Sequence, residues 1–215
     1  MLLESALPVF GGRLDFARAV ERNLADAAAV ASGGRPQLLF FEPAAPLLTL
    51  GRRAQAGGSD VAESVAVCRA RGVEVAAADR GGLATLHLPG QLVVFLAVPL
   101  PTLGIRFLVR HLLDSAAAVA RRRGCDPQVR DDHDAGLWLA DAKLASVGLR
   151  VQRGVVLHGM ALNVALAPEV VAGAAFPGLT LCGHANARLA DLGARAPAAV
   201  ADVAAELARQ LRTAG

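Results

Sequence analysis

Lys143 is the first residue whose type suggests proton-transfer chemistry, because it is the only lysine among 22 basic side chains. The others are arginines, which stay protonated at any working pH, whereas a lysine loses its proton when its surroundings lower its pKa. The alternating residues from Leu144 onward predict a strand, and an ammonium group between apolar neighbours is costly to bury without a partner. Composition alone favours the alternative that Lys143 is a chance survivor in an arginine-rich sequence.

Cys182 is the best candidate nucleophile among three cysteines. It lies in a polar sequence that contains glycine, LCGH, whereas Cys68 falls on a predicted helix and Cys125 follows another. A thiol becomes nucleophilic as the thiolate, which a neighbouring lysine or histidine stabilises. Lys143 and His184 both remain candidates for that partner. An odd number of cysteines without a CxxC pair argues against a disulfide framework or a zinc site.

A third group of unusual residues is DRGGLATLHLPGQ, residues 79–91. Adjacent glycines let the backbone approach a ligand closely and point N–H groups at it. Thr85 and His87 alternate along the extended segment that follows. The alternative is a hairpin with a polar edge, and the Gly-Lys-Ser/Thr of a phosphate-binding loop is missing. His158 lies in another apolar run, where a satisfied core histidine is more common than a catalytic base.

The elements that must position these residues follow from hydrophobic periodicity and from proline and glycine breaks. They predict one α/β or α+β domain over residues 1–215, with a mixed central sheet flanked by helices. We expect helices over 13–31, 60–71, 105–123 and 197–211, and strands over 37–50 (split by Pro43 and Pro46), 73–78, 91–98, 136–140, 144–152 and 155–164.

Composition excludes several classes of protein. The 54% share of hydrophobic residues provides for a substantial core, and the most apolar stretch, residues 92–109, contains two prolines and an arginine that argue against a membrane span. The net charge is only +3 and aromatic residues make up 4%, which disfavours a nucleic-acid surface. The N-terminus lacks the basic region of a signal peptide, so we expect a cytoplasmic protein without membrane contact.

Three segments, in order, resemble the lipoyl(octanoyl)transferase family. Residues 79–91 resemble its Arg-Gly-Gly-x-x-Thr-Tyr-His-Gly-Pro-Gly-Gln motif. AKLASVGLRVQRGVVLHGMALNV resembles its Lys-Ile-x-x-Ile-Gly-hydrophobic-Arg followed by His-Gly-x-Ala-Leu-Asn, and LCGH resembles its Pro-Cys-Gly. The resemblance runs from about Gly51 to Gly183. Leu86, Leu88 and Leu181 depart from the motifs, and we expect them to make the site more apolar.

The resemblance implies a fold similar to biotin and lipoate protein ligases, with Cys182 and Lys143 as the catalytic dyad. Cys182 would take the octanoyl group from octanoyl-acyl carrier protein as a thioester. A lysine of a lipoyl domain or of glycine-cleavage H protein would then accept it, while Lys143 moves the protons. The implied reaction uses no ATP, no other cofactor and no metal. Two alternatives stay open: an ATP-dependent lipoate or biotin ligase, and a non-catalytic relative that binds carrier proteins.

The resemblance also implies a set of substrate-binding residues around the acyl chain. Backbone N–H groups near Gly81-Gly82 and Gly148 would hold the acyl carbonyl. The implied set is Arg80, Gly81, Gly82, Leu83, Ala84, Thr85, Leu86, His87, Ser146, Val147, Gly148, Gly159, Met160 and Ala161.

Overall fold

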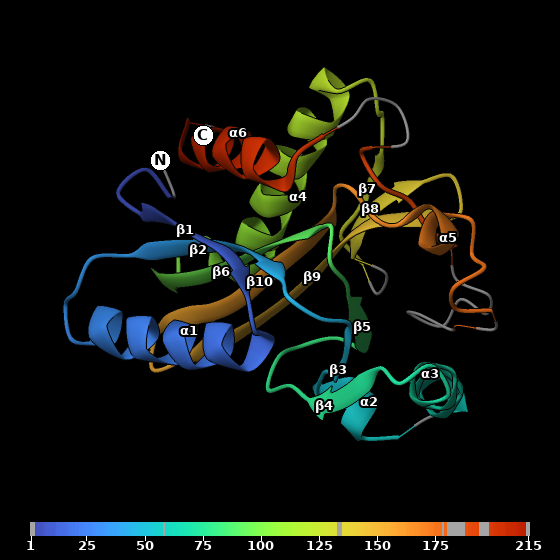
Figure 1. Cartoon of the computed structure of the whole chain (residues 1–215). Helices are drawn as coiled ribbons and strands as arrows, with labels where there is room; N and C mark the ends of the chain where they lie inside the picture. The colour runs from blue at the N-terminus through green and yellow to red at the C-terminus, as the bar shows by residue number, and fades with distance from the viewer. Residues whose placement is uncertain are drawn as a thin grey trace.

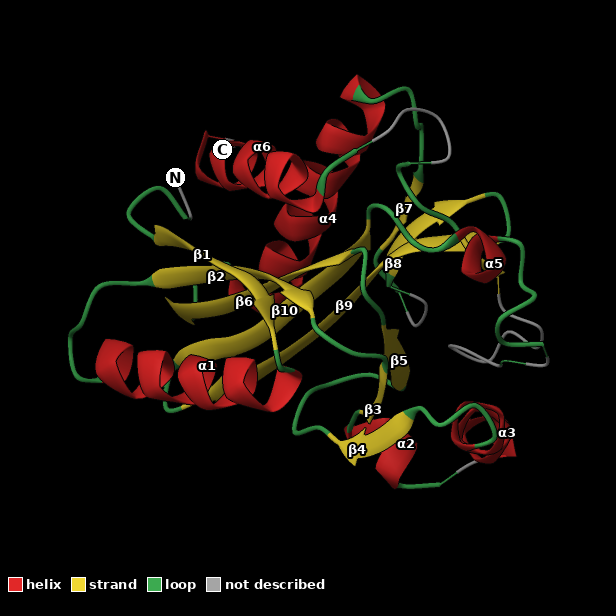
Figure 2. Ribbon diagram, viewed as in Figure 1, coloured by secondary structure: helices red, strands yellow, loops and turns green. Residues whose placement is uncertain are grey.

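The architecture is a large mixed sheet with helices on both faces and a smaller sheet beside it (Figures 1 and 2). The computed structural model describes residues 3–57, 59–132, 135–177, 179, 188–193 and 198–213. Strand order in the large sheet is β1 (Leu7–Leu14), β2 (Gln37–Pro43), β6 (Gln91–Pro99), β10 (Val155–Asn163), β9 (Ala142–Gln152), β8 (Gly136–Leu139) and β7 (Gln128–Arg130), with β11 (Arg188–Leu189) beside β9. The β1–β2 and β9–β11 pairs are parallel and the others antiparallel. The predicted fold class is confirmed.

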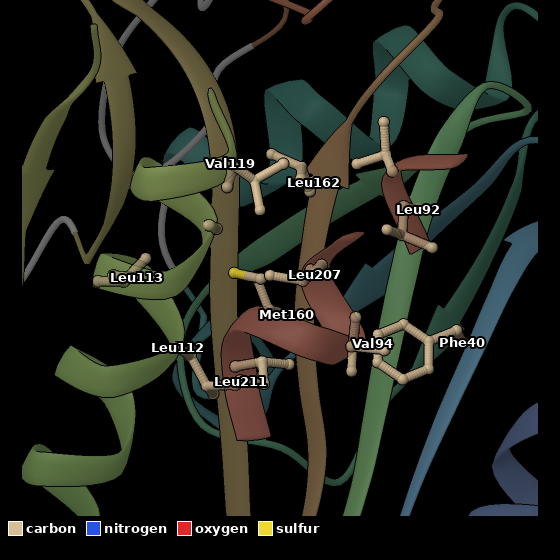
Figure 3. Packing of buried hydrophobic residues seen from close by; sticks show 14 of the residues in the cluster. Phe40, Leu92, Val94, Leu112, Leu113, Val119, Met160, Leu162, Leu207 and Leu211 are labelled. Atoms are coloured by element: carbon tan, nitrogen blue, oxygen red, sulfur yellow. The ribbon is translucent and has the colours of Figure 1, made fainter. Parts of the chain in front are cut away.

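Helices cover the two faces of the large sheet differently. Helix α1 (Phe16–Ala31) contacts β6 and β10 on one face, whereas α4 (Gly104–Arg122) and α6 (Val200–Thr213) pack together on the opposite face. The main core lies beneath α4 and α6, where leucines of both helices meet strand residues such as Val94 and Met160 (Figure 3). Burying these apolar side chains provides most of the driving force for this packing.

The smaller sheet corrects the expectation of one sheet around one core. Strands β4 (Glu74–Ala77), β3 (Leu47–Leu50) and β5 (Ala84–His87) form it, with α2 (Arg52–Gln55) and α3 (Ser59–Arg69) nearby (Figure 1). The two apolar runs in residues 37–50 therefore lie in different sheets. Pro43 ends β2 and Pro46 precedes β3, and because proline interrupts strand ladders, the chain leaves the large sheet between them.

The N-terminal prediction was also wrong in part. Residues 13 and 14 complete strand β1, and helix α1 begins only at Phe16. Asp15 is the cause, because its Oδ1 accepts hydrogen bonds from the N–H groups of Ala17 and Arg18, at 2.9 and 3.2 Å. This N-terminal cap fixes where the helix starts and so places Phe16 at the first helical position. A short helix, α5 (Pro168–Val171), lies in the region after β10.

Helix α4 ends as predicted, since Gly124 after it has a φ of 77°. The described cysteines are both packing residues: Cys68 and Cys125 are buried, in the smaller and the main core respectively. Within the described ranges, none of the helices has both the length and the apolar character needed to cross a bilayer.

A single asparagine joins α1 to the middle of the large sheet. Asn23 is buried; its Nδ2 donates to the Leu96 carbonyl at 2.7 Å, and its Oδ1 accepts from the His158 N–H at 2.9 Å. His158 has a φ of 58°, a left-handed conformation that is uncommon for a non-glycine residue. The carboxamide thus satisfies two backbone groups where the β6–β10 pairing is interrupted.

We predict that Asn23→Leu lowers the free energy of unfolding by about 2–4 kcal/mol, because it leaves two buried backbone groups without partners. Urea denaturation of both proteins measures the difference. Glu21→Ala, an exposed position on the same helix, is the matched control and should change the value by less than about 0.5 kcal/mol. A similar effect for both variants would contradict this role of Asn23.

Candidate active site

Lys143 is buried next to a cavity rather than exposed at the surface. Lys143 lies near the start of β9 and is only 3% exposed. Its Nζ is 4.7 Å from the centroid of the Trp138 ring. Trp138 is its partner in the β8–β9 pairing. A Cβ at Gly136 would come within 2.9 Å of the Lys143 Cε, so the missing side chain there leaves room for the lysine. The indole face is therefore placed to stabilise the ammonium form of Lys143 whenever this side chain holds a proton.

The cavity beside Lys143, of about 300 Å³, joins segments that are far apart in the sequence. One wall is the strand segment 146–149 of β9, and the facing wall is the loop 80–85 that precedes and begins β5. Ile105 and Val109 of α4 close a third side. We call this space the lysine cavity.

A narrower, mostly apolar space leads inward from the lysine cavity, and we call it the inner pocket. Its floor consists of two pairs of small residues on neighbouring strands, Ser146 with Ala161 and Gly148 with Gly159. A Cβ at Gly148 would lie 2.9 Å from the Arg80 Cδ, and one at Gly159 would overlap the backbone of β6. Glycine at position 148 therefore leaves room for Arg80, and glycine at position 159 lets β6 lie close to β10.

The residues implied by the resemblance are largely brought together here. Those lining the inner pocket are Arg80, Thr85, His87, Ser146, Val147, Gly148, Gly159, Met160 and Ala161. Those lining the lysine cavity without reaching the inner pocket are Gly81, Gly82, Leu83 and Ala84. Sequence reasoning missed Phe16, Val93, Phe95 and His158 as walls of the inner pocket; no local motif marks Phe16.

Two expectations about the site need correction. Leu86 and Leu88 both pack into the smaller core, so the apolar character that they add goes mainly into that core, although Leu86 also borders a small space beside Lys143. The Gly81 N–H donates to the Leu149 carbonyl at 2.9 Å, so in this conformation it is already used and does not await a substrate carbonyl. Cys182 and Leu181 lie outside the described residues.

Buried polar side chains tie the smaller sheet to this site. The Arg80 guanidinium donates to the carbonyls of Gly81, Leu83 and Thr49, each at 3.0 Å, and to Thr49 Oγ1 at 2.7 Å. Arg80 therefore holds its own loop in shape. Thr49 Oγ1 in turn lies 3.2 Å from His87 Nε2. Nothing in the sequence around Thr49 predicted its part in the site.

The same hydrogen-bonded chain continues to Lys143. His87 Nδ1 lies 2.9 Å from Gln91 Oε1, Gln91 Nε2 donates to Asn163 Oδ1 at 2.9 Å, and Asn163 Nδ2 donates to the Lys143 carbonyl at 3.1 Å. We call the series from Arg80 to the Lys143 carbonyl the buried relay. It fixes the backbone from which the Lys143 side chain departs.

Both histidines of the site are held neutral. Burial, followed by the positive charge of Arg80, lowers the pKa of His87 to about 3 and that of His158 to about 4. A neutral His87 can donate from Nδ1 to Gln91 and accept at Nε2 from the Thr49 hydroxyl. His87 is therefore a fixed link in the relay at neutral pH and carries no charge there.

The chain matches the model of the lipoyl protein ligase A/B catalytic domain family over residues 15–211, and it belongs to this family. An octanoyltransferase from Methylococcus capsulatus is 43% identical over 147 residues, which cover 66% of this chain and 67% of that protein. The human mitochondrial octanoyl-[acyl-carrier-protein]:protein N-octanoyltransferase LIPT2 is 40% identical over 132 residues, 59% of this chain and 54% of that protein. An octanoyltransferase from Deinococcus radiodurans is 37% identical over 71% of this chain but only 47% of its own length. The chain therefore spans about half the length of the human and the Deinococcus radiodurans relatives.

Solved structures show the same fold at low sequence identity. A lipoate-protein ligase A bound with ATP superposes with a TM-score of 0.65 at 15% identity, covering 95% of this chain and 81% of that one. A bipartite lipoate protein ligase from Thermoplasma acidophilum gives 0.66 at 15% identity, covering 96% and 82%. A biotin protein ligase from Leishmania major gives 0.56 at 13% identity, covering 95% and 72%. The predicted likeness to biotin and lipoate ligases is confirmed at the level of the fold.

The low pKa of His87 predicts an acid-sensitive protein. In the unfolded chain a histidine titrates near 6.5, so between about pH 6.5 and 3 the unfolded state binds more protons and the folded state loses stability as the pH falls. Between pH 6 and 5 this loss is about 1 kcal/mol for each such histidine. Urea denaturation at several pH values measures the free energy of unfolding as a function of pH. Between pH 6 and 5 we expect this free energy to fall by about 1 kcal/mol less in His87→Gln than in the wild type. An equal loss in both proteins would mean that His87 is not held neutral.

Proposed function

We propose that this chain transfers an octanoyl group from an acyl carrier protein to a specific lysine of a lipoyl-dependent protein, through a thioester on Cys182. The observation that carries the proposal is the placement of Lys143, which is buried and lines a cavity that continues into an apolar pocket. An enzyme that carries a fatty acyl group needs such a pocket beside its reacting groups. The relatives named octanoyltransferase support the same reaction.

In the first half-reaction, the Cys182 sulfur attacks the thioester carbonyl of the donor while Lys143 takes the thiol proton. The tetrahedral intermediate expels the carrier's thiolate, which takes that proton back from Lys143. The acyl group is now a thioester of Cys182. In the second half-reaction, the amine of the acceptor lysine attacks this thioester, an amide bond forms, and Lys143 relays the released proton to the departing Cys182 thiolate.

The energetics of this sequence need no ATP. Exchange of one thioester for another is nearly isoenergetic, and conversion of a thioester to an amide is downhill. The lysine cavity, of about 300 Å³, would hold most of the acyl tail, and the end of the tail would reach the inner pocket. Cys182 remains the proposed nucleophile partly because the other cysteines are buried: burial raises the pKa of Cys68 to about 11, well above the range in which a thiol reacts readily at neutral pH.

The proposed partners are an octanoyl-acyl carrier protein as donor and a lipoyl domain or glycine-cleavage H protein as acceptor. Acyl carrier proteins are acidic, and the chain's net charge of +3 is of the complementary sign. We propose that residues 1–215 act as one catalytic domain with these partners.

Intact mass spectrometry after incubation with octanoyl-acyl carrier protein tests the proposal. The wild-type chain should gain one octanoyl group, and Cys182→Ser should gain none. Cys125→Ala, at a buried cysteine, is the matched control and should still be acylated. Binding of the carrier without any adduct would contradict the proposed function. Retention of ATP-dependent ligation in Cys182→Ser would favour instead the ligase activity named for the solved structures of the same fold.

Lys143→Arg tests the second member of the dyad. Arginine keeps the charge but cannot exchange its proton, so we predict that kcat/KM for octanoyl transfer falls by about 10²–10⁴. Because the room beside Gly136 is limited, Lys143→Met serves as a second variant that removes the proton-transfer group without adding bulk. Thermal unfolding and the circular dichroism spectrum establish that each variant folds. Wild-type activity in a folded variant would leave Lys143 without a catalytic role.

A further inference from the structure

A large cavity lies beyond the inner pocket, on the side away from Lys143. Its volume is about 510 Å³, and we call it the distal cavity. Its walls are the first turns of α1, the start of β3, and β4 with the residues that follow it. Apolar side chains from these elements, among them Val20 and Leu47, line much of it. No part of the proposed octanoyl reaction requires this space.

The inner pocket lies between the two larger cavities and shares walls with both. It shares Arg80, Thr85 and the strand segment 146–148 with the lysine cavity, and Phe16, Ala78 and His158 with the distal cavity. Its own free volume is only about 20 Å³. The three spaces are therefore neighbours that share walls, and the smallest of them lies between the other two.

Aromatic rings line the distal end of the inner pocket. The Phe16 ring centroid lies 4.4 Å from that of His87 and 5.6 Å from that of Phe95. The His158 ring lies edge-on to Phe95 at 5.5 Å. Phe16 belongs to α1 and not to either sheet, so it is the ring that can be replaced without altering a strand or a hydrogen bond of the buried relay.

The charges around the distal cavity limit what it can hold. Asp15, Glu21, Glu74 and Asp79 lie along its walls, and Arg150, an arginine among the described wall residues, is ion-paired with Asp79. A ligand group with a negative charge would be repelled by these carboxylates, whereas an uncharged hydrocarbon end would meet the apolar part of the lining.

We propose that the distal cavity is an extension of the acyl site and that Phe16 sets the length of the acyl chain that the enzyme accepts. An octanoyl tail that enters from the lysine cavity ends against the Phe16 ring. The additional methylene groups of a longer saturated chain fit only if that ring is displaced, and the distal cavity then takes them. This inference rests on the proposed function.

Acyl transfer from octanoyl-, dodecanoyl- and hexadecanoyl-acyl carrier protein tests the inference, with kcat/KM and the mass of the acyl-enzyme as readouts. The wild-type chain should prefer the octanoyl donor. Phe16→Ala should raise the ratio of kcat/KM for the dodecanoyl donor to that for the octanoyl donor by about tenfold or more, because admitting or excluding even one methylene group changes kcat/KM by about that factor. Phe10→Ala is the matched control: Phe10 is an exposed phenylalanine on β1, and this variant should keep the wild-type ratio.

Two further variants distinguish a specific effect of Phe16 on chain length from a general loss of packing. Phe16→Leu removes the ring but retains apolar packing, and it should shift the ratio in the same direction if Phe16→Ala is too unstable to assay. The double variant Phe16→Ala with Ala76→Phe refills the distal cavity and should restore the octanoyl preference.

The outcomes distinguish the inference from the function on which it rests. Octanoyl transfer by the wild type with an unchanged chain-length ratio in both Phe16 variants would overturn the role of Phe16. A raised ratio that persists in the double variant would overturn the role of the distal cavity. Failure of the wild type to be acylated by any donor would overturn the proposed function itself and the inference with it.

Discussion

The buried relay is the constraint on which the site depends, because it connects the smaller sheet to the strand that carries Lys143. Its direction at His87 follows from Gln91. The Gln91 Oε1 that lies 2.9 Å from His87 Nδ1 only accepts hydrogen bonds, while Gln91 Nε2 donates onward to Asn163. This assigns the proton of neutral His87 to Nδ1. A second proton on this ring would turn the Nε2 acceptor into a donor, and the low pKa of about 3 keeps that proton off.

The second constraint is space, which the large sheet provides by leaving side chains out. Gly148 and Gly159 face each other across β9 and β10, and a side chain at either position would meet Arg80 or the backbone of β6. The relay and the glycines thus depend on one another. Arg80 comes close to Gly148 only because no side chain stands there, and its guanidinium, once placed, holds the loop that roofs the pocket. Asn23 contributes from the other side by supporting the interrupted pairing at His158, beside this floor.

Local patterns predicted most strands of the large sheet and the three long helices, whereas the family resemblance implied the grouping of residues 80–87 with 146–148 and 159–161. They failed where position is set by distant parts of the chain. Thr49 has no motif of its own, and it joins the site only because β3 pairs with β5. Phe16 enters the inner pocket because the Asp15 cap sets where α1 begins, and the expected helix from residue 13 hid that boundary. The smaller sheet was missed because periodicity identifies a strand but not the sheet that it joins.

Burial also bears on why a single lysine remains among so many arginines. Drift from lysine to arginine is nearly neutral for exposed side chains, where either residue serves a solvated surface. Lys143 is not such a position, since it is buried between Gly136, Trp138 and the lysine cavity. A guanidinium there would need partners for five N–H groups, whereas an ammonium needs three and can face the indole ring. The alternative of a chance survivor therefore loses its main support, because the argument from composition applies to surfaces and this lysine is inside.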